Sequence, residues 1–297
     1  MIIDSHTHIF SPDVVSHRER YTSRDIFFAY LYSNPKARLV GVDEILAAMD
    51  AAGVDQAILA GWAWQRNDTC IEQNTWLMET AREHPDRLMV LASVQPSVGG
   101  DAVRELHRCI AGGAVGIGEL NADGQNFRLD DSDFIALARE IAELGVPLLL
   151  HTNEPVGHVY PGKGKLPLVD VYALVKALPD LKLVLGHWGG GFPFYELMPE
   201  VRAVSRNVFY DSAASPLLYS IDIFRAVASI VGSDKVLFGS DFPLILYPKR
   251  QQEPSFAPFL EEIRGVGLAS EDLANILGEN ARRIWTACMV DENSVER

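Results

Sequence analysis

Cysteine is scarce in this chain, which has only Cys70, Cys109 and Cys288 among 297 residues. An odd number of widely spaced cysteines excludes a disulfide framework and a CxxC metal site, so we expect a reducing compartment. The sequence also lacks an apolar stretch of about 20 residues and a basic, apolar leader at its N-terminus. We therefore expect no membrane partner and a cytoplasmic location.

Positive charge is in deficit as well. The chain has 26 basic and 40 acidic residues, which gives a net charge of −14. This balance argues against a nucleic-acid partner and favours a freely soluble protein that acts on a small molecule. It does not fix the charge of the substrate, because one or two local arginines can override the global field.

Apolar content is high, at 48%, and is divided into short runs that alternate with amphipathic segments. The runs are Met1–Asp4, Gln56–Ala60, Leu88–Val94, Val115–Glu119, Pro147–His151, Lys182–His187, Val208–Asp211 and Val236–Asp241. The segments with helical periodicity are Val42–Ala52, Ile71–His84, Asp101–Ala111, Asp131–Leu144, Leu168–Leu178, Tyr195–Ser205, Ile221–Val231 and Phe256–Arg264. Eight strands, each followed by a helix, predict an α/β fold of the (β/α)₈ TIM-barrel type, with residues 1–297 as a single domain.

A doubly wound open sheet is the alternative fold, but no glycine-rich phosphate loop follows the first strand. The connection after that strand, Ile9–Val40, is unusually long and rich in aromatic residues, so we expect either a lid over the barrel mouth or a satellite packing cluster. A final helix is expected to begin at a Ser270 cap and to pack across the barrel wall.

The first strand runs into two histidines that are one residue apart. Side chains alternate along a strand, so His6 and His8 point to the same side, with Asp4 in line behind them. Two imidazoles at the end of a buried strand can bind one divalent metal ion. A surface histidine pair or an expression tag is the alternative.

Other potential ligands also stand where apolar runs end, and in a barrel those ends converge on one mouth. In chain order these residues are His6 and His8, Glu119, His151, His187, Asp211 and Asp241. Four histidines at strand ends together with carboxylates predict a metal centre.

At these positions the chain resembles the amidohydrolase superfamily, and within it the amidohydrolase-2 group related to aminocarboxymuconate semialdehyde decarboxylase. The motifs that carry the resemblance are Asp4-x-His6-x-His8, Gly116-Ile-Gly-Glu119, Leu150-His151, Gly186-His187-Trp-Gly-Gly-Gly191, Gly239-Ser-Asp241-Phe-Pro243 and Ile276-Leu-Gly-Glu-Asn280-Ala-Arg.

The resemblance implies roles for these residues. His6, His8 and Asp241 match ligands of the first metal ion, and His151 matches a further ligand. His187 matches a histidine that acts on metal-bound water or binds a second ion. The resemblance also implies one or two divalent ions and a possible homodimer. Three histidines with carboxylates suit zinc, and manganese, iron and cobalt are the alternatives. Independently of the family, a bound divalent ion makes hydroxide available near neutral pH, and a carboxylate and an imidazole can then move protons.

Glu119 departs from the decarboxylase pattern, in which the fourth strand carries no ligand. TatD-type nucleases and phosphotriesterase-like hydrolases place a glutamate or a carboxylated lysine there, bridging two metal ions. Glu119 therefore favours two ions and hydrolysis. Its alternative role is to hydrogen-bond a histidine ligand.

Substrate contacts are expected from Arg66, Tyr160 and Lys163, which follow the ends of the second and fifth strands and could bind a carboxylate. A solvated loop is the alternative for each of them. Gly189, Gly190 and Gly191 lack the context of a phosphate loop and are better explained by a tight turn beside the metal.

These observations lead us to expect a metal-dependent hydrolase of a small amide, ester or lactone. Metal-bound hydroxide would attack, Asp241 would accept its proton and His187 would polarise the substrate. The alternative is a metal-dependent non-oxidative decarboxylase of an aromatic or enoic acid, in which an acidic group protonates the carbon left behind. A metal-binding barrel without turnover, serving as a sensor or scaffold, is a third possibility.

Overall fold

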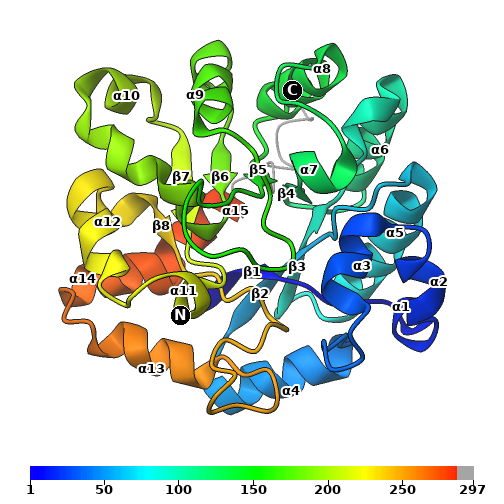
Figure 1. Ribbon diagram of the computed structural model, residues 1–297, viewed down its shortest axis with the longest axis horizontal. Helices are drawn as coiled ribbons and strands as arrows, with labels where there is room; N and C mark the ends of the chain where they lie inside the picture. Colours follow the sequence, from blue (N-terminus) through cyan, green and yellow to red (C-terminus); the bar gives the residue numbers. More distant parts are fainter. Residues whose placement is uncertain (286–297) are drawn as a thin grey trace, which may run out of the picture.

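The computed structural model describes residues 1–285, in which eight parallel strands pair in chain order from β1 to β8. Helices surround these strands on all sides (Figure 1). The strands are β1 (Ile3–Thr7), β2 (Gln56–Ala60), β3 (Leu88–Ala92), β4 (Gly116–Leu120), β5 (Leu148–Leu150), β6 (Leu183–Leu185), β7 (Val208–Asp211) and β8 (Val236–Leu237). The (β/α)₈ barrel predicted from the sequence is confirmed.

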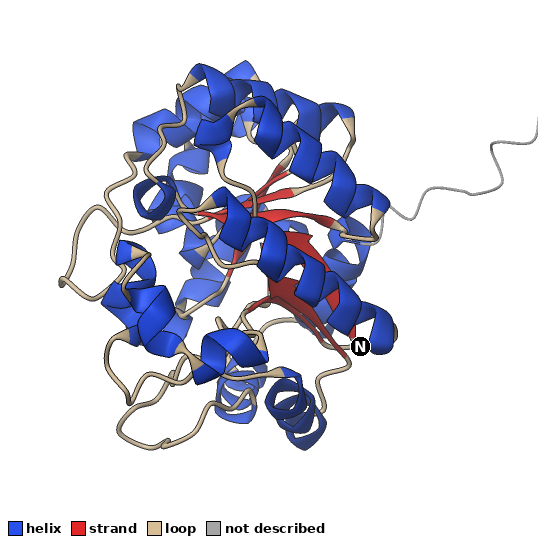
Figure 2. Ribbon diagram, turned by 90° about the vertical axis from the view of Figure 1, so that its right-hand side faces the viewer, coloured by secondary structure: helices blue, strands red, loops and turns tan. Residues whose placement is uncertain are grey.

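The helices that follow the strands lie around the sheet (Figure 2). Their buried apolar residues pack against it. They are α4 (Val42–Ala52), α5 (Asn67–Glu83), α6 (Gly100–Ala111), α7 (Ala122–Gln125), α8 (Ser132–Glu143), α9 (Leu168–Ala177), α10 (Pro199–Val204), α11 (Ser215–Leu218), α12 (Ile223–Val231) and α13 (Ala257–Gly265). Short turns η1 (Pro96–Val98) and η3 (Ser233–Lys235) precede α6 and β8. Within the described residues, no helix is long and apolar enough to cross a membrane.

Strand β8 is only two residues long, yet the barrel closes through the segment that follows it. Backbone amides of Ser5 and His8 donate to the carbonyls of Phe238 and Phe242, at 2.8 and 2.7 Å. The Asp241 amide donates in return to the His6 carbonyl at 2.9 Å. This closure places Asp241 directly beside the two histidines of β1.

The first strand was expected to end at Asp4, but it extends to Thr7, and all five of its residues are buried. The polar side chains find partners inside the barrel: the Thr7 hydroxyl donates to the Ile58 carbonyl, and the Asp4 carboxylate accepts the amides of His6 and Ser240. Buried polar groups with such partners do not interrupt a strand.

The long connection Ile9–Val40 contains three short helices, α1 (Pro12–Ser16), α2 (Arg18–Thr22) and α3 (Ile26–Tyr32). Its aromatic side chains form a cluster with two tryptophans of the β2–α5 loop, with neighbouring ring centroids 4.7 to 6.5 Å apart. We call this the aromatic cluster; its rings are Phe10, Tyr21, Phe28, Tyr32, Trp62 and Trp64. The expected satellite cluster is therefore present.

The final helical segment begins one residue earlier than expected, because Ala269 is the cap and Ser270 is already helical. The segment consists of α14 (Ser270–Ala274), the π-helical turn η4 (Asn275–Glu279) and α15 (Asn280–Trp285). Ile284 and Trp285 of α15 join the inward-facing apolar residues Ile3, Leu149 and Leu237. Helix α15 thus closes one end of the barrel core.

Candidate metal centre and active site

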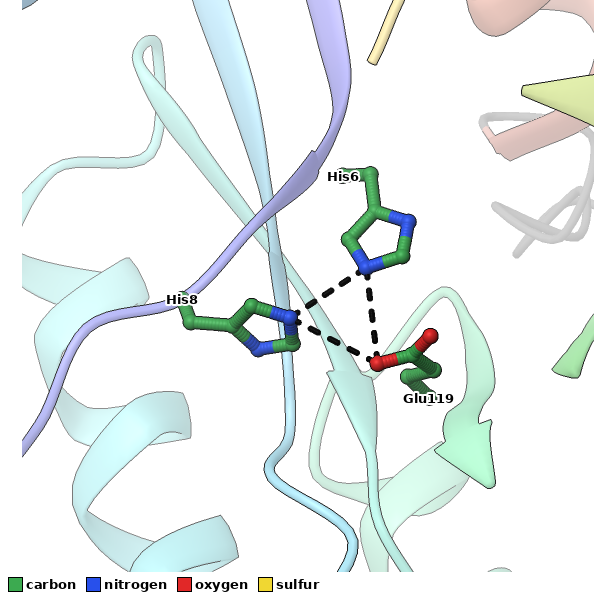
Figure 3. Close-up of side chains that lie close together, drawn as sticks. All are labelled: His6, His8 and Glu119. Atoms are coloured by element: carbon green, nitrogen blue, oxygen red, sulfur yellow. Dashed lines mark hydrogen bonds and ion pairs between the residues drawn. The ribbon is translucent and has the colours of Figure 1, made fainter. Parts of the chain in front are cut away.

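Two groups of metal-ligating side chains meet where the strands end. In the first group, His6 and His8 bring their Nε2 atoms within 3.2 Å of each other. The Glu119 Oε2 atom lies 3.5 Å from His6 Nε2 and 3.6 Å from His8 Nε2 (Figure 3). Asp241 Oδ1 lies 3.9 and 3.5 Å from the same two nitrogens.

The second group uses the other oxygen of the same glutamate. Glu119 Oε1 lies 2.6 Å from His151 Nδ1 and 3.5 Å from His187 Nε2. The two imidazoles are themselves 3.2 Å apart at His151 Nδ1 and His187 Nε2. Glu119 therefore faces each group with one carboxylate oxygen, an arrangement suited to a ligand shared by two cations.

Hydrogen bonds at the Nδ1 atoms set the tautomers of three histidines. His6 donates to Asp211 Oδ2 at 2.8 Å, His8 to the Ala60 carbonyl at 3.0 Å, and His187 to the Ala213 carbonyl at 3.1 Å. Their Nε2 lone pairs consequently point into the site, as those of metal-bound histidines do.

The donor set fits a divalent cation. The facing lone pairs of His6 and His8 repel each other unless a proton or a cation lies between them. His151 Nε2 is buried without a hydrogen-bond partner among the described residues. The carboxylates of Glu119 and Asp241 are buried too, and buried anions need a compensating positive charge.

The ionisation of the site reflects the same need for positive charge beside the buried carboxylates. Burial raises the pKa of the Glu119 carboxyl, but the charges of His151 and His6 outweigh it and hold this pKa well below its usual range. Burial lowers the pKa of His187, whereas Glu119 and Asp241 raise it, to about 9 in total. Burial raises the pKa of Asp4 to about 7. Glu119 therefore remains an anion, and it stabilises positive charge on the histidines that contact it.

A cavity of about 380 Å³ opens onto these groups. Its apolar wall includes Phe27 and Trp62, whose rings stack at 5.6 Å and 30°. Leu31 and Tyr32 complete the contribution of α3. The connection Ile9–Val40 therefore also forms part of the pocket wall, in addition to its role in the aromatic cluster.

The predicted substrate contacts divide into two sets. Tyr160 lines the cavity. Arg66 does not: its side chain is more than half exposed and is paired with Asp68. Lys163 lines a neighbouring cavity, and its Nζ donates to the backbone carbonyls of Val156 and His158 at 2.6 and 3.1 Å. The structure does not bring Arg66 or Lys163 to the walls of the metal-side cavity.

Three further residues take part in the site. Asp211, which stands at a strand end and could orient Asp241 or His187 or cap the next helix, accepts from the amide of His187 and also from the ring of His6. Tyr32 and Asn153 line the cavity. Only the position of Asp211 at a strand end carried a sequence signal, since loop folding brings the other two residues in.

The glycine run does form the expected tight turn beside the metal ligands, within η2 (His187–Leu197). Residues 187 to 191 all have positive φ, between 55° and 92°. A Cβ at Gly190 would lie 2.3 Å from the Asn153 carbonyl oxygen. Glycine is needed there for both the left-handed conformation and the close approach of the β5–α9 loop.

Comparison with known proteins finds decarboxylases among the relatives of this chain. An amidohydrolase family model matches residues 3–286. 2-Amino-3-carboxymuconate-6-semialdehyde decarboxylase of Dictyostelium discoideum is 24% identical, over 94% of this chain and 90% of its own. Gamma-resorcylate decarboxylase of Rhizobium radiobacter is 27% identical, over 68% and 76%.

Solved structures give the same picture of the fold. 5-Carboxyvanillate decarboxylase of Sphingomonas paucimobilis superposes with a TM-score of 0.78 at 22% identity, covering 96% of this chain and 98% of its own. A dihydroxybenzoic acid decarboxylase of Polaromonas, with bound manganese and the inhibitor 2-nitroresorcinol, gives 0.73 at 20% identity, covering 96% of each chain.

The expectation of hydrolysis is wrong in the light of these relatives, which are named as decarboxylases. That expectation depended on Glu119, whose position between two ligand groups does not by itself select a reaction. One barrel architecture can host different reactions, so the candidate ligands alone do not determine which bond of the substrate breaks.

Proposed function

Because the chain belongs to the amidohydrolase family, we propose that it is a metal-dependent non-oxidative decarboxylase of an aromatic carboxylic acid. The observation that carries the proposal is the direct contact between the ligand groups and an aromatic-walled cavity. Phe27, Trp62 and Tyr32 line the same 380 Å³ space as His8, Glu119 and Asp241. A benzoic acid would place its ring against the aromatic wall and its carboxylate at the ligands.

His6, His8, Glu119, His151, His187 and Asp241 are the residues proposed to hold the metal. A divalent ion bound there supplies positive charge that fixes the oxygens of the substrate and stabilises the electrons left by the departing carbon dioxide. Zinc is the ion we expect, because imidazole nitrogens outnumber carboxylate oxygens in the donor set. Elemental analysis separates it from manganese.

Asp241 is proposed as the proton donor. Its side chain is 13% exposed and lines the cavity between the histidines of β1 and the substrate space. The bond from the ring to the carboxylate breaks, carbon dioxide leaves with no change in oxidation state of the protein, and the electron pair stays on the ring carbon. Asp241 rests as a carboxylate, so it first accepts a proton from a phenolic hydroxyl of the substrate and then delivers that proton to the ring carbon. The phenolate oxygen recovers its proton from water.

The remaining groups position the substrate. The hydrogen bond from His187 Nδ1 to the Ala213 carbonyl directs His187 Nε2 into the site. There Nε2 lies 3.5 Å from Glu119 Oε1 and can orient an oxygen of the substrate. Phe27, Leu31 and Trp62 exclude water from the ring, which protects the carbanion-like electron pair from uncontrolled protonation.

Carbon dioxide release tests the proposal. The purified protein is incubated with hydroxylated benzoic acids and, as a comparison, with phenyl esters and lactones, before and after reconstitution with zinc or manganese. Metal-dependent release of carbon dioxide with formation of the corresponding phenol is expected. Turnover of esters or lactones without any carbon dioxide release would contradict the proposal.

A further inference from the structure

The walls of the metal-side cavity carry no lysine or arginine among the described residues. Beyond the candidate metal ligands, its side chains with polar atoms are Tyr32, Trp62, Asn153, His158 and Tyr160, and the indole nitrogen of Trp62 is buried. The metal can neutralise one carboxylate of a substrate, but a second carboxylate would need another cation, because a buried unpaired anion is costly.

Both cations that could have served are engaged elsewhere. Lys163 Nζ is held by two backbone carbonyls of its own loop, and Arg66 is paired with Asp68 at the surface. The loop that carries Tyr160 is itself fixed in place: the Gly164 amide donates to Asn153 Oδ1, and Gly162 lies against Leu31 of α3, where an added Cβ would be 3.2 Å from Leu31 Cδ1. Figure 1 shows this green β5–α9 loop crossing in front of the strands.

The hydrogen bonds of Tyr160 restrict what its hydroxyl can do. It donates its proton to Glu154 Oε2 at 3.1 Å and accepts a proton from Asn153 Nδ2 at 3.1 Å. One lone pair remains. A substrate group at this hydroxyl must therefore be a donor, such as a phenolic hydroxyl or an amine, and cannot be a carboxylate.

Glu154 adds a charge of the wrong sign for a dicarboxylic acid. Its Oε2 accepts from Tyr160, and the same carboxylate also accepts from the hydroxyl of Tyr219. This carboxylate lies one hydrogen bond behind the cavity wall, so it repels a second carboxylate there while strengthening the acceptor character of the Tyr160 oxygen.

We propose that the substrate is a monocarboxylic phenol that places a hydrogen-bond donor at Tyr160, and that the cavity rejects dicarboxylic acids. This inference rests on the proposed decarboxylation and adds the substrate class. Selection by a carboxylate behind the cavity wall and by a tyrosine that already donates its proton is a form of specificity by exclusion.

A matched pair of compounds tests it. 2,4-Dihydroxybenzoate and 2-hydroxyterephthalate differ only in a hydroxyl or a carboxylate opposite the reacting group. With the metal-loaded protein, we expect kcat/KM and the binding constant by calorimetry to favour the dihydroxy acid at least tenfold. His158 is the one basic side chain of the cavity wall outside the candidate metal ligands, so the pair is also measured in His158→Gln, where the preference should be equal or larger.

Two variants make the test specific. Leu218→Arg places a cation on the cavity wall and should improve binding of 2-hydroxyterephthalate at least tenfold, whereas Leu197→Arg, at an exposed leucine outside the cavity, should not. Tyr160→Phe should reduce the preference for 2,4-dihydroxybenzoate over 2-hydroxybenzoate, because the acceptor is removed.

The outcomes separate the two proposals. Equal or better use of the dicarboxylic acid by the unmodified protein would overturn the substrate inference and leave decarboxylation standing. Failure to bind or decarboxylate any of the three acids in the metal-loaded protein would overturn the proposed function, and the substrate inference with it.

Discussion

Asp211 holds His6 in the orientation that the metal site requires. Its Oδ2 accepts from His6 Nδ1 at 2.8 Å, and both side chains are fully buried. The other oxygen, Oδ1, accepts the amides of His187 and Ala213, so one carboxylate connects β1 to the turn after β6 and to the end of β7. A histidine ligand fixed in this way loses little freedom when it binds a metal ion.

We predict that Asp211→Asn lowers metal affinity by about 10- to 100-fold. A neutral amide could still accept from His6, but it would no longer stabilise positive charge on the imidazole. Competition with a chromophoric chelator measures the change. Asp222→Asn is the control, since Asp222 is exposed and pairs with Arg225 at the surface. Unchanged affinity in Asp211→Asn would show that the His6 contact has no part in metal binding.

Glu119 gives a prediction about stoichiometry. Because it offers one oxygen to each ligand group, we expect two divalent ions per chain in the native protein and one in Glu119→Gln. Elemental analysis of protein purified without chelator or added metal provides the count. Glu140→Gln removes a surface glutamate that also pairs with a histidine, His107, and should leave two ions in place.

A count of one ion in both the native protein and Glu119→Gln would show that Glu119 only orients a histidine. Dialysis against a chelator should abolish carbon dioxide release in either case, and reconstitution should restore it. Activity that survives complete metal removal would contradict the metal-dependent mechanism itself.

Much of the barrel could be predicted from the sequence because its periodicity is local. Strands Gln56–Ala60 and Val208–Asp211 and helix Val42–Ala52 have the predicted bounds. The helix is preceded by Gly41 and ends at Gly53, which is left-handed as a C-cap glycine should be. The predicted bounds were wrong where tertiary contacts determine where an element ends. Strand β1 extends through the polar residues Asp4–Thr7, because their hydrogen-bond partners come from distant strands.

The convergence of the candidate metal ligands could be predicted for a similar reason, because the end of a parallel strand fixes where its last side chain points. The substrate contacts could not. Lys163 and Tyr160 are three residues apart in one loop, yet only Tyr160 reaches the cavity, since the Lys163 side chain folds back onto its own backbone. That difference depends on the loop conformation, which has no repeating pattern.

The glycine turn allows a matched stability comparison. Gly190 and Gly191 both have positive φ, 59° and 92°, so alanine at either position should cost about 1–2 kcal/mol. A Cβ at Gly190 would also clash with the Asn153 carbonyl at 2.3 Å, whereas at Gly191 the nearest atom, of Phe194, is 4.0 Å away. Gly190→Ala should therefore unfold at clearly lower denaturant concentration than Gly191→Ala. Equal destabilisation would mean that the β5–α9 loop moves away without cost.

Asp241→Asn separates catalysis from folding. Asp241 has φ 67°, a conformation that asparagine tolerates better than most residues, and its amide still donates to the His6 carbonyl. The fold should therefore be retained, while loss of the proton donor should lower kcat for 2,4-dihydroxybenzoate by about 10²–10⁴-fold.

Thermal unfolding, bound metal and carbon dioxide release are measured on the same sample. A kcat within threefold of the native value, with metal bound, would remove Asp241 as the proton donor. Unfolding of the variant would instead assign the residue, and the metal it holds, a mainly structural role.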